Sequence, residues 1–411
     1  MQSGRLGLAV LALCTAVAAH ADETALDVDY SLRLAYFSHD RLPTPGPAQS
    51  ISSLWLRSNM TLSTDVKLYT EGWLLAVADG QGDTGSRADL REGWLSWSQN
   101  DLDFKVGRRI VVWGRADKIN PTDQITPIDH TLLFSSDDDH RSGSFMTAVG
   151  VPVTRTSKLE LLWLPEFRPH RLRLAAAPGT TLQDGPQEGW VPTQAAIRYD
   201  NSGSSIDWSV SYFNGLDRMP EITALSPTLF QQQHHRIQTL GADVATTVGA
   251  LGLRGEVAYT AVAHGDQADR KHSFLHIVAG GDTDVTESIN VNIQALFKHV
   301  MGDLSPARFA NPLDQVVALQ NNIISEQTSR DRYGFSARIG WHGFNDTATC
   351  ELSALVYPQL NESLLRGKAS YAFTDTIQGF AGFDLFNGDS ESSFGALRKT
   401  SLGYVGVRVG Y

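Results

Sequence analysis

The chain has 411 residues, a formal net charge of −11, 36 glycines and 42% hydrophobic residues. A soluble protein of this length would ordinarily contain two or three domains, and all-β barrels are the known exception. The acidic balance and the lack of a clustered basic tract argue against nucleic acid as a partner.

The N-terminus has the features of a secretory signal peptide over residues 1–21. Arg5 precedes an apolar run, and Ala19-His20-Ala21 supplies the small residues of a cleavage site. We expect cleavage after Ala21, so that an exported chain begins at residue 22. Beyond this point no run approaches the roughly 20 apolar residues that a transmembrane helix needs. A helical membrane protein is therefore excluded.

Past residue 21, apolar and polar residues alternate with a period of two, which predicts amphipathic β-strands. Leu26, Val28 and Tyr30, for example, alternate with Asp27 and Asp29. The same pattern recurs over residues 54–62, 102–107, 289–298 and 333–341. Strands of about 10 to 12 residues are longer than those of most soluble β-sandwiches and suit tilted strands that cross a bilayer. A β-propeller would show an internal repeat, which we do not find.

The connections between these strands alternate in length. Short turns fall near residues 63–65, 98–100, 154–156, 201–203, 249–250, 343–345 and 374–375. Longer stretches rich in Pro, Gly and Asp occupy residues 38–49, 78–88, 113–144, 165–192, 214–235, 301–329 and 387–399. We count about 18 strands, with 16 as the alternative, in an all-β transmembrane antiparallel barrel over residues 22–411. With a periplasmic N-terminus, the short turns lie in the periplasm and the long loops outside the cell.

The last predicted strand, residues 403–411, directs Val405, Val407, Val409 and Tyr411 outward. A terminal aromatic residue on such a strand resembles the signal that outer-membrane barrels present to the barrel-assembly machinery. Together with the signal peptide, it predicts a location in the outer membrane of a Gram-negative cell. The partners expected there are that machinery, membrane lipid and lipopolysaccharide.

One long connection, residues 112–144, breaks the alternation and is dense in charges and turn residues. It is the third long connection, and porins commonly fold their third loop into the lumen, so the segment resembles a constriction loop in position. A loop of this length is usually functional or disordered. Its apolar residues predict packing against the barrel: Ile119, Ile125, Ile128, Leu132, Leu133 and Phe134. Trp55 and Trp73 point into the lumen on the same alternation, where they stack on a solute or pack under this loop.

Seven charged side chains of the early strands are predicted to line the pore: Arg33, Arg57, Lys67, Glu71, Arg91, Lys105 and Arg109. The predicted constriction loop adds Arg115, Asp117, Lys118, Asp123, Asp129 and Arg141. The basic excess on the strands favours an anionic solute or acidic saccharide, because a basic wall attracts anions through a narrow opening. In the alternative, these charges pair with one another and with loop carboxylates and only stabilise the barrel.

Three short motifs lie close together: Gly107-Arg108-Arg109, Trp113-Gly114 and Ile119-Asn120-Pro121-Thr122-Asp123. This stretch resembles a family of uncharacterised proteobacterial outer-membrane proteins, DUF1302. The resemblance extends weakly through Pro152-Val153 to Pro165-Glu166-Phe167. It implies an outer-membrane barrel and says little about cargo. In strand number and charged lumen faces, the chain is more distantly similar to the alginate-export porins.

We therefore expect a porin-like channel for a polar solute or polysaccharide, with no cofactor, metal site or catalytic residue. One alternative is a plugged barrel that acts as a structural or assembly partner in an envelope export system. A less favoured alternative is an outer-membrane hydrolase. Its candidate bases, His234, His235, His272 and His276, have no spaced acidic partner in the sequence.

Overall fold

The computed structural model describes residues 25–40, 46–79, 84–134, 136–172, 174, 176–177, 179–185, 189–203, 205–263 and 267–410. The predicted signal peptide and Tyr411 lie outside the described residues, so neither prediction is tested by the structure.

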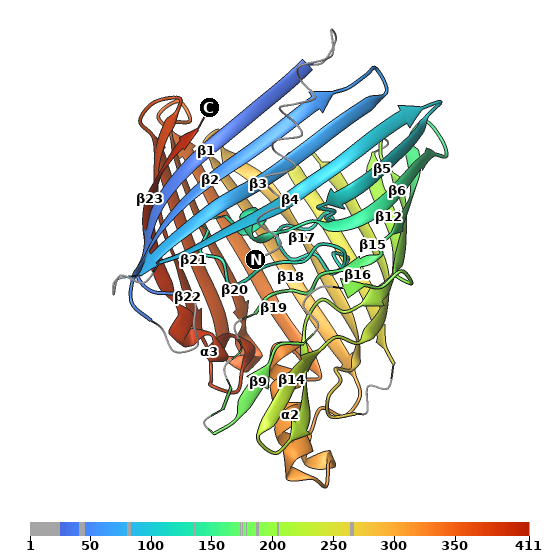
Figure 1. The fold of residues 1–411 in the computed structure, drawn as a ribbon, viewed down its shortest axis with the longest axis vertical. Helices are drawn as coiled ribbons and strands as arrows, with labels where there is room; N and C mark the ends of the chain where they lie inside the picture. The colour runs from blue at the N-terminus through green and yellow to red at the C-terminus, as the bar shows by residue number, and fades with distance from the viewer. Residues whose placement is uncertain are drawn as a thin grey trace.

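Eighteen antiparallel strands form one closed barrel (Figure 1). The first nine are β1 (Ala25–Phe37), β2 (Gln49–Thr61), β3 (Val66–Asp79), β4 (Thr84–Gln99), β5 (Leu102–Arg109), β6 (Ser144–Pro152), β7 (Ser157–Trp163), β11 (Ala195–Asn201) and β12 (Ile206–Leu216). The other nine are β15 (Arg236–Val248), β16 (Leu251–Val262), β17 (Ser273–Thr286), β18 (Ile289–Met301), β19 (Asp331–Gly343), β20 (Ala348–Tyr357), β21 (Glu362–Ala372), β22 (Ile377–Asn387) and β23 (Leu402–Gly410). Each strand pairs with the next along the chain, and β1 closes the barrel by pairing with β23. The prediction of about 18 strands is confirmed.

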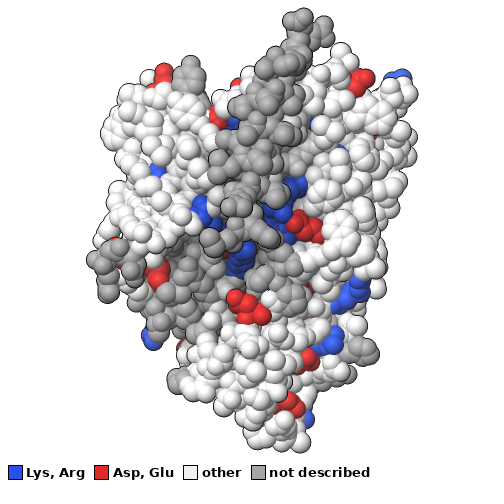
Figure 2. Space-filling model, viewed as in Figure 1, with Lys and Arg blue, Asp and Glu red and all other residues white. Residues whose placement is uncertain are grey.

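The predicted alternation sorts side chains between the two faces of the wall. On β1, the side chains of Leu32 and Leu34 are exposed on the outer face, whereas Ser31 is buried on the inner face. Val405, Val407 and Val409 are likewise exposed. Apolar side chains belong on the outer face because lipid surrounds a membrane barrel. Figure 2 shows one side of the molecule, on which most of the visible surface carries no charge.

The short turns lie at one end of the barrel and the long loops at the other. One predicted loop is wrong: residues 78–88 are mostly strand, since β3 runs to Asp79 and β4 begins at Thr84. The Gly, Asp and Ser residues there break strands in solution, but Ala78 still pairs with Thr84 and continues the ladder. A further connection, residues 263–272, is longer than the sequence pattern indicated.

The long loops carry secondary structure of their own. The strands there are β8 (Glu166–Phe167), β9 (Thr181–Gln183), β10 (Gly189–Trp190), β13 (Glu221–Ser226) and β14 (Leu229–Gln233). The helices are α2 (Pro312–Ile324), α3 (Ser393–Ala396) and the single 3₁₀ turns η1 (Asp137–His140), η2 (Pro306–Arg308), η3 (Pro358–Leu360) and η4 (Arg398–Thr400). Within the described residues, no helix is both long enough and apolar enough to span a membrane.

Strand β5 leaves the wall after Arg109, and the chain then turns into the barrel. The backbone N–H of Ile110 donates to the Glu92 carboxylate at 2.8 Å. Where β5 departs, Gly143, just before β6, donates its N–H to the carbonyl of Arg91 on β4 at 2.8 Å. This bond links the start of β6 to β4 just beyond the end of β5. Because β5 pairs with both β4 and β6, the wall stays continuous while residues 110–143 occupy the lumen.

Candidate functional site

Residues 110–143, here called the inserted loop, correspond to the predicted constriction loop within two residues. In Figure 1 this segment lies inside the ring of strands. Two parts of it make most of the wall contacts described below. We call residues 114–122 the polar arm and residues 132–134 the aromatic arm.

The polar arm is held by Glu256, which points inward from β16 and is only 3% exposed. The Glu256 carboxylate accepts hydrogen bonds from the Ala116 N–H at 2.6 Å, the Asn120 amide at 2.9 Å and the Thr122 hydroxyl at 3.1 Å. Gly114 has φ +106°, and a Cβ there would lie 2.4 Å from Glu256 Oε1. The Trp113-Gly114 motif therefore lets the backbone turn beside this carboxylate.

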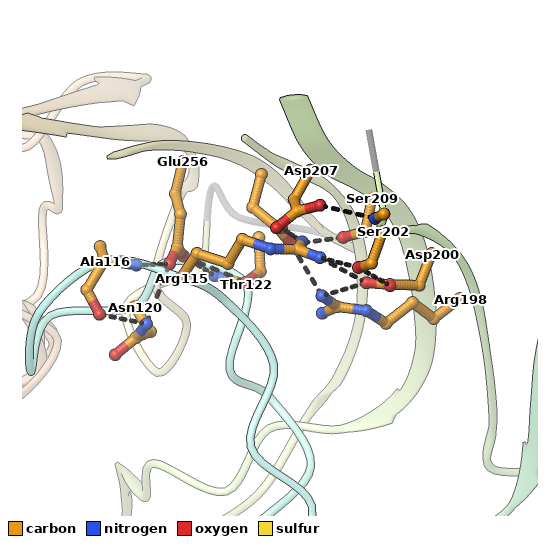
Figure 3. Close-up of polar contacts among 12 residues, drawn as sticks. Arg115, Ala116, Asn120, Thr122, Arg198, Asp200, Ser202, Asp207, Ser209 and Glu256 are labelled. Carbon is orange, nitrogen blue, oxygen red and sulfur yellow. Dashed lines mark hydrogen bonds and ion pairs between the residues drawn. The ribbon is translucent and has the colours of Figure 1, made fainter. Parts of the chain in front are cut away.

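Arg115 fixes the same arm to the neighbouring strands (Figure 3). Its guanidinium pairs with Asp200 on β11 at 2.8 Å and with Asp243 on β15. Asp243 also pairs with Arg198 at 3.2 Å, and its side chain is fully buried. A forked guanidinium that bridges two carboxylates fixes position strongly, since its donors are planar and rigid.

The end of the polar arm reaches the other side of the lumen. Asp117 pairs with Arg338 on β19 at 2.7 Å, and Lys118 pairs with Glu351 on β20. The inserted loop thus contacts strands from β11 to β20 and crosses the barrel rather than lying against one wall.

The aromatic arm packs on the opposite wall. The Phe134 ring lies 5.3 Å from Trp55 and 5.6 Å from Trp73, measured between ring centroids, with edge-to-face geometry. Leu132 and Leu133 are buried in the same cluster. Inward-facing Trp55 and Trp73 therefore pack under the inserted loop, which is one of the two roles that the sequence allowed. Of the other predicted apolar residues, Ile125 is fully buried.

The register places six of the seven residues predicted to line the pore on the inner face, and an ion pair with Glu71 turns the seventh, Arg91, inward as well. The seven are in two different states. Four of them are paired: Arg33 with Asp139, Arg57 with Asp29 at 2.6 Å, and Arg91 with Glu71, itself one of the seven, at 2.5 Å. Arg91 reaches inward from a bulge, because Glu92 rather than Arg91 lies opposite Glu71.

The other three predicted cations, Lys67, Lys105 and Arg109, have no ion pair with any described residue at 4.0 Å or less. Lys105 and Arg109 lie beside the ring of Trp94, at 5.2 and 6.0 Å from its centroid. Cation–π contact compensates only part of the lost hydration of a cation. These side chains keep positive charge on the inner face.

The six charges predicted on the loop are all paired. Asp123 binds Arg141 at 2.6 Å, and Asp129 binds Arg87 at 3.0 Å. Burial raises the pKa of Asp123 to about 6, although Arg141 acts in the opposite direction. With Arg115, Asp117 and Lys118 paired as described above, the alternative of mutual pairing describes all six predicted loop charges.

Sequence reasoning missed the cations on the last strands. Two cavities, of about 750 and 640 Å³, lie between the inserted loop and the wall. Arg408 on β23 lines both of them, and Lys368 on β21 lines the smaller one. Both cavities are bordered by Arg33, Asp139, Gln378 and Arg408. The alternation of Val405, Val407 and Val409 would have placed Arg408 on the inner face.

A second connection also folds inward, at the long-loop end. Ser325, just after α2, accepts a hydrogen bond from Lys298 on β18 at 2.8 Å. Glu326 pairs with Arg332 at 2.7 Å, and Arg332, only 1% exposed, also pairs with buried Glu362 at 2.7 Å. This cluster ties residues 325–332 to the wall and narrows that side of the mouth.

One of the four candidate histidines has an acidic partner in the structure, contrary to the prediction from the sequence. His235 does have an acidic partner, since its Nδ1 contacts Glu221. His234 contacts the carbonyl of Asp217 at 2.8 Å. Among the described residues, no three His, Cys, Asp or Glu side chains gather closely enough to hold a metal ion.

Several solved structures share the fold. OccAB4 of Acinetobacter baumannii is 10% identical, with a TM-score of 0.55 and coverage of 95% of this chain and 98% of that chain. OpdK of Pseudomonas aeruginosa, solved with vanillate, is 9% identical, with a TM-score of 0.54 and coverage of 94% and 98%. OccK2 (OpdF) of the same organism, solved with glucuronate, is 10% identical, with a TM-score of 0.54 and coverage of 94% and 95%.

At the level of sequence, no curated protein matches the chain. The model of the family described as "Protein of unknown function (DUF1302)" matches residues 69–342, which include most of the barrel and the entire inserted loop. The chain therefore belongs to the DUF1302 family.

Proposed function

We propose that this protein is a passive outer-membrane channel for a small polar solute, with a mild preference for anions. The observation that carries the proposal is the pair of cavities of about 750 and 640 Å³ that the inserted loop leaves beside β18 to β23 and β1 to β4. The loop is fixed by Glu256 and Arg115 on one side and by Trp55 and Trp73 on the other. Its constriction is therefore preformed.

The charges of the wall support only a mild preference. Four described, inward-facing wall cations have no hydrogen bond or ion pair: Lys67, Lys105, Arg109 and Lys368. Two inward-facing acidic residues of the described wall, Asp27 and Glu160, likewise have no hydrogen bond or ion pair. Because paired charges largely cancel, this small excess of free cations sets the sign of the local potential.

The solved structures offer parallel support. Vanillate and glucuronate, the molecules named with OpdK and OccK2, are both carboxylates. An acidic saccharide would present the same charged group to the wall. Neutral solutes of similar size fit the same cavities.

The proposal is tested by recordings of the refolded protein in a planar bilayer under a gradient of potassium chloride. We expect steady openings and a reversal potential of the sign that chloride permeation produces. A reversal potential of the opposite sign would contradict the anion preference and leave the channel intact.

The plugged barrel remains the second candidate because the inserted loop contacts strands on both sides of the lumen. It predicts no conductance in the same recordings and a stable partner that purifies with the protein from its native membrane. We propose no catalytic role.

A further inference from the structure

Arg408 is a wall cation with most of its hydrogen-bonding capacity unused. It lies directly opposite Gln378 on β22 and Arg33 on β1. Its Nε donates to the Ser31 hydroxyl at 3.0 Å, and its two terminal nitrogens have no partner among the described residues. Arg33 beside it is already engaged by Asp139. The free edge of the Arg408 guanidinium therefore remains available where the two cavities share their border.

Lys368 supplies a second free cation to the same wall. It is an exposed residue on β21, has no partner in the described part of the chain and lines the 640 Å³ cavity together with Ser370, Gln378 and Arg408. Gln378 donates its amide to Ser370 at 3.1 Å. The cavity thus combines two free cations with a neutral amide.

The wall between the two cations is apolar and flat. Phe380 lies on the inner face between the level of Lys368 and that of Arg408, directly opposite Gly406. A Cβ on Gly406 would lie 2.5 Å from Phe380 Cζ, so glycine allows the ring to lie against the strand. Tyr404 continues this apolar patch, with its ring 6.4 Å from that of Phe380.

The acidic residues of this cavity do not cancel both cations. Asp139 is paired with Arg33, and Glu351 is paired with Lys118. Asp138 also lines the cavity, but from the inserted loop. A single anion is thus attracted to the wall of β21 to β23 and repelled by the loop.

We propose that Arg408 and Lys368, with Gln378 between the strands that carry them, form a binding site for the oxyanion of a small solute, either a carboxylate or a phosphate. A guanidinium edge binds such groups through two parallel hydrogen bonds. Phe380 gives an apolar surface to a solute that carries a ring or chain. The site deepens the proposed channel function and rests on it for its biological role, but its binding can be measured without conduction.

The test is isothermal titration calorimetry of the detergent-solubilised barrel with benzoate, acetate and inorganic phosphate. We expect saturable binding that weakens at least about tenfold, or about 1.4 kcal/mol, in the double variant Arg408→Gln, Lys368→Gln, because each substitution removes a charged hydrogen bond to the oxyanion. Benzoate tighter than acetate and phosphate identifies a carboxylate with an apolar body. Phosphate tighter than both carboxylates identifies a phosphate site.

The matched control is Lys67→Gln, which removes a free inner-face cation that lines neither cavity. It is expected to bind every probe as the unmodified protein does. Equal affinity in the double variant and the unmodified protein, or equal weakening by the control, overturns the site. Folding of each variant is checked by the heat-dependent shift of its electrophoretic mobility.

Conductance of the same preparations separates the two proposals. A protein that conducts but binds none of the three probes refutes the oxyanion site and leaves the channel. A protein that binds a probe through Arg408 and Lys368 but never conducts refutes the channel and leaves the site.

Discussion

The two arms of the inserted loop are held to the barrel by different forces. The polar arm uses hydrogen bonds and ion pairs to Glu256 and Arg338 and the fork of Arg115, whereas the aromatic arm buries Phe134 between Trp55 and Trp73. Ion pairs gain little net free energy because the partners lose hydration, but they demand one geometry. Buried aromatic contacts contribute more free energy and tolerate small shifts. We infer that the polar arm fixes the position of the constriction and that the aromatic arm contributes most of the free energy that keeps the inserted loop in the lumen.

Removal of most of the inserted loop should have the largest effect. Deletion of residues 119–140 takes away residues 119–122 of the polar arm and the whole aromatic arm, so single-channel conductance should rise severalfold. The deleted protein must still show the mobility shift of a folded barrel. Unchanged conductance in a folded deletion variant would mean that the inserted loop is not the narrowest point.

Truncation of the aromatic arm's support should cost most in stability. Trp73→Ala leaves a cavity beneath Phe134, and such changes cost about 3 to 5 kcal/mol in a packed core. Guanidinium unfolding followed by tryptophan fluorescence measures the loss. Leu74→Ala on the same strand is the matched control, because Leu74 is exposed on the outer face. In detergent it should cost clearly less.

Removal of Glu256, which accepts the hydrogen bonds of the polar arm, should make the position of that arm less fixed and should lower the stability of the barrel less. Glu256→Ala leaves Ala116, Asn120 and Thr122 without their acceptor, at about 1 to 3 kcal/mol for each buried donor that water does not reach. We expect conductance that fluctuates between levels and faster trypsin cleavage at Arg115 or Lys118. Glu256→Gln keeps one acceptor oxygen, so its conductance fluctuations and its rate of trypsin cleavage should lie between those of the unmodified protein and those of Glu256→Ala. Steady openings in Glu256→Ala would show that the other contacts suffice.

The smallest effect concerns pH and the buried Asp123. Its pKa of about 6 in the folded protein lies above the ordinary 3.8, so the folded state binds the extra proton between these values. Loop stability should therefore rise as pH falls through 6 toward 4 and decline as pH rises through the same window. Trypsin cleavage of the loop at pH 5 and pH 7 measures this. Asp123→Asn should flatten the dependence, and an unchanged dependence would assign it to another group.

The period-two pattern was sufficient to predict the barrel. In lipid every backbone polar group needs an internal partner, and alternating strands of this length meet that demand only when the sheet closes. The same pattern placed Trp55, Trp73 and the seven charged residues on the inner face. It failed at residues 78–88, where turn-forming residues remain paired because the ladder continues beyond the apolar band.

The break in the alternation also located the inserted loop, since a segment without strand periodicity cannot continue the wall. The order of residues along the chain was thus enough to predict the face on which each strand side chain lies and the segment that leaves the wall. It was not enough to predict which charges are neutralised, because that depends on contacts between distant segments. Glu256 meets Ala116 from 140 positions away and Arg33 meets Asp139 from 106 positions away. Such pairs form because barrel closure and the path of the loop bring distant residues together. The alternation of apolar and polar residues predicts neither the closure partners nor the path of the loop. Arg408 and Lys368 have no ion pair within the described residues for the same reason: their strands face the part of the lumen that the loop does not fill.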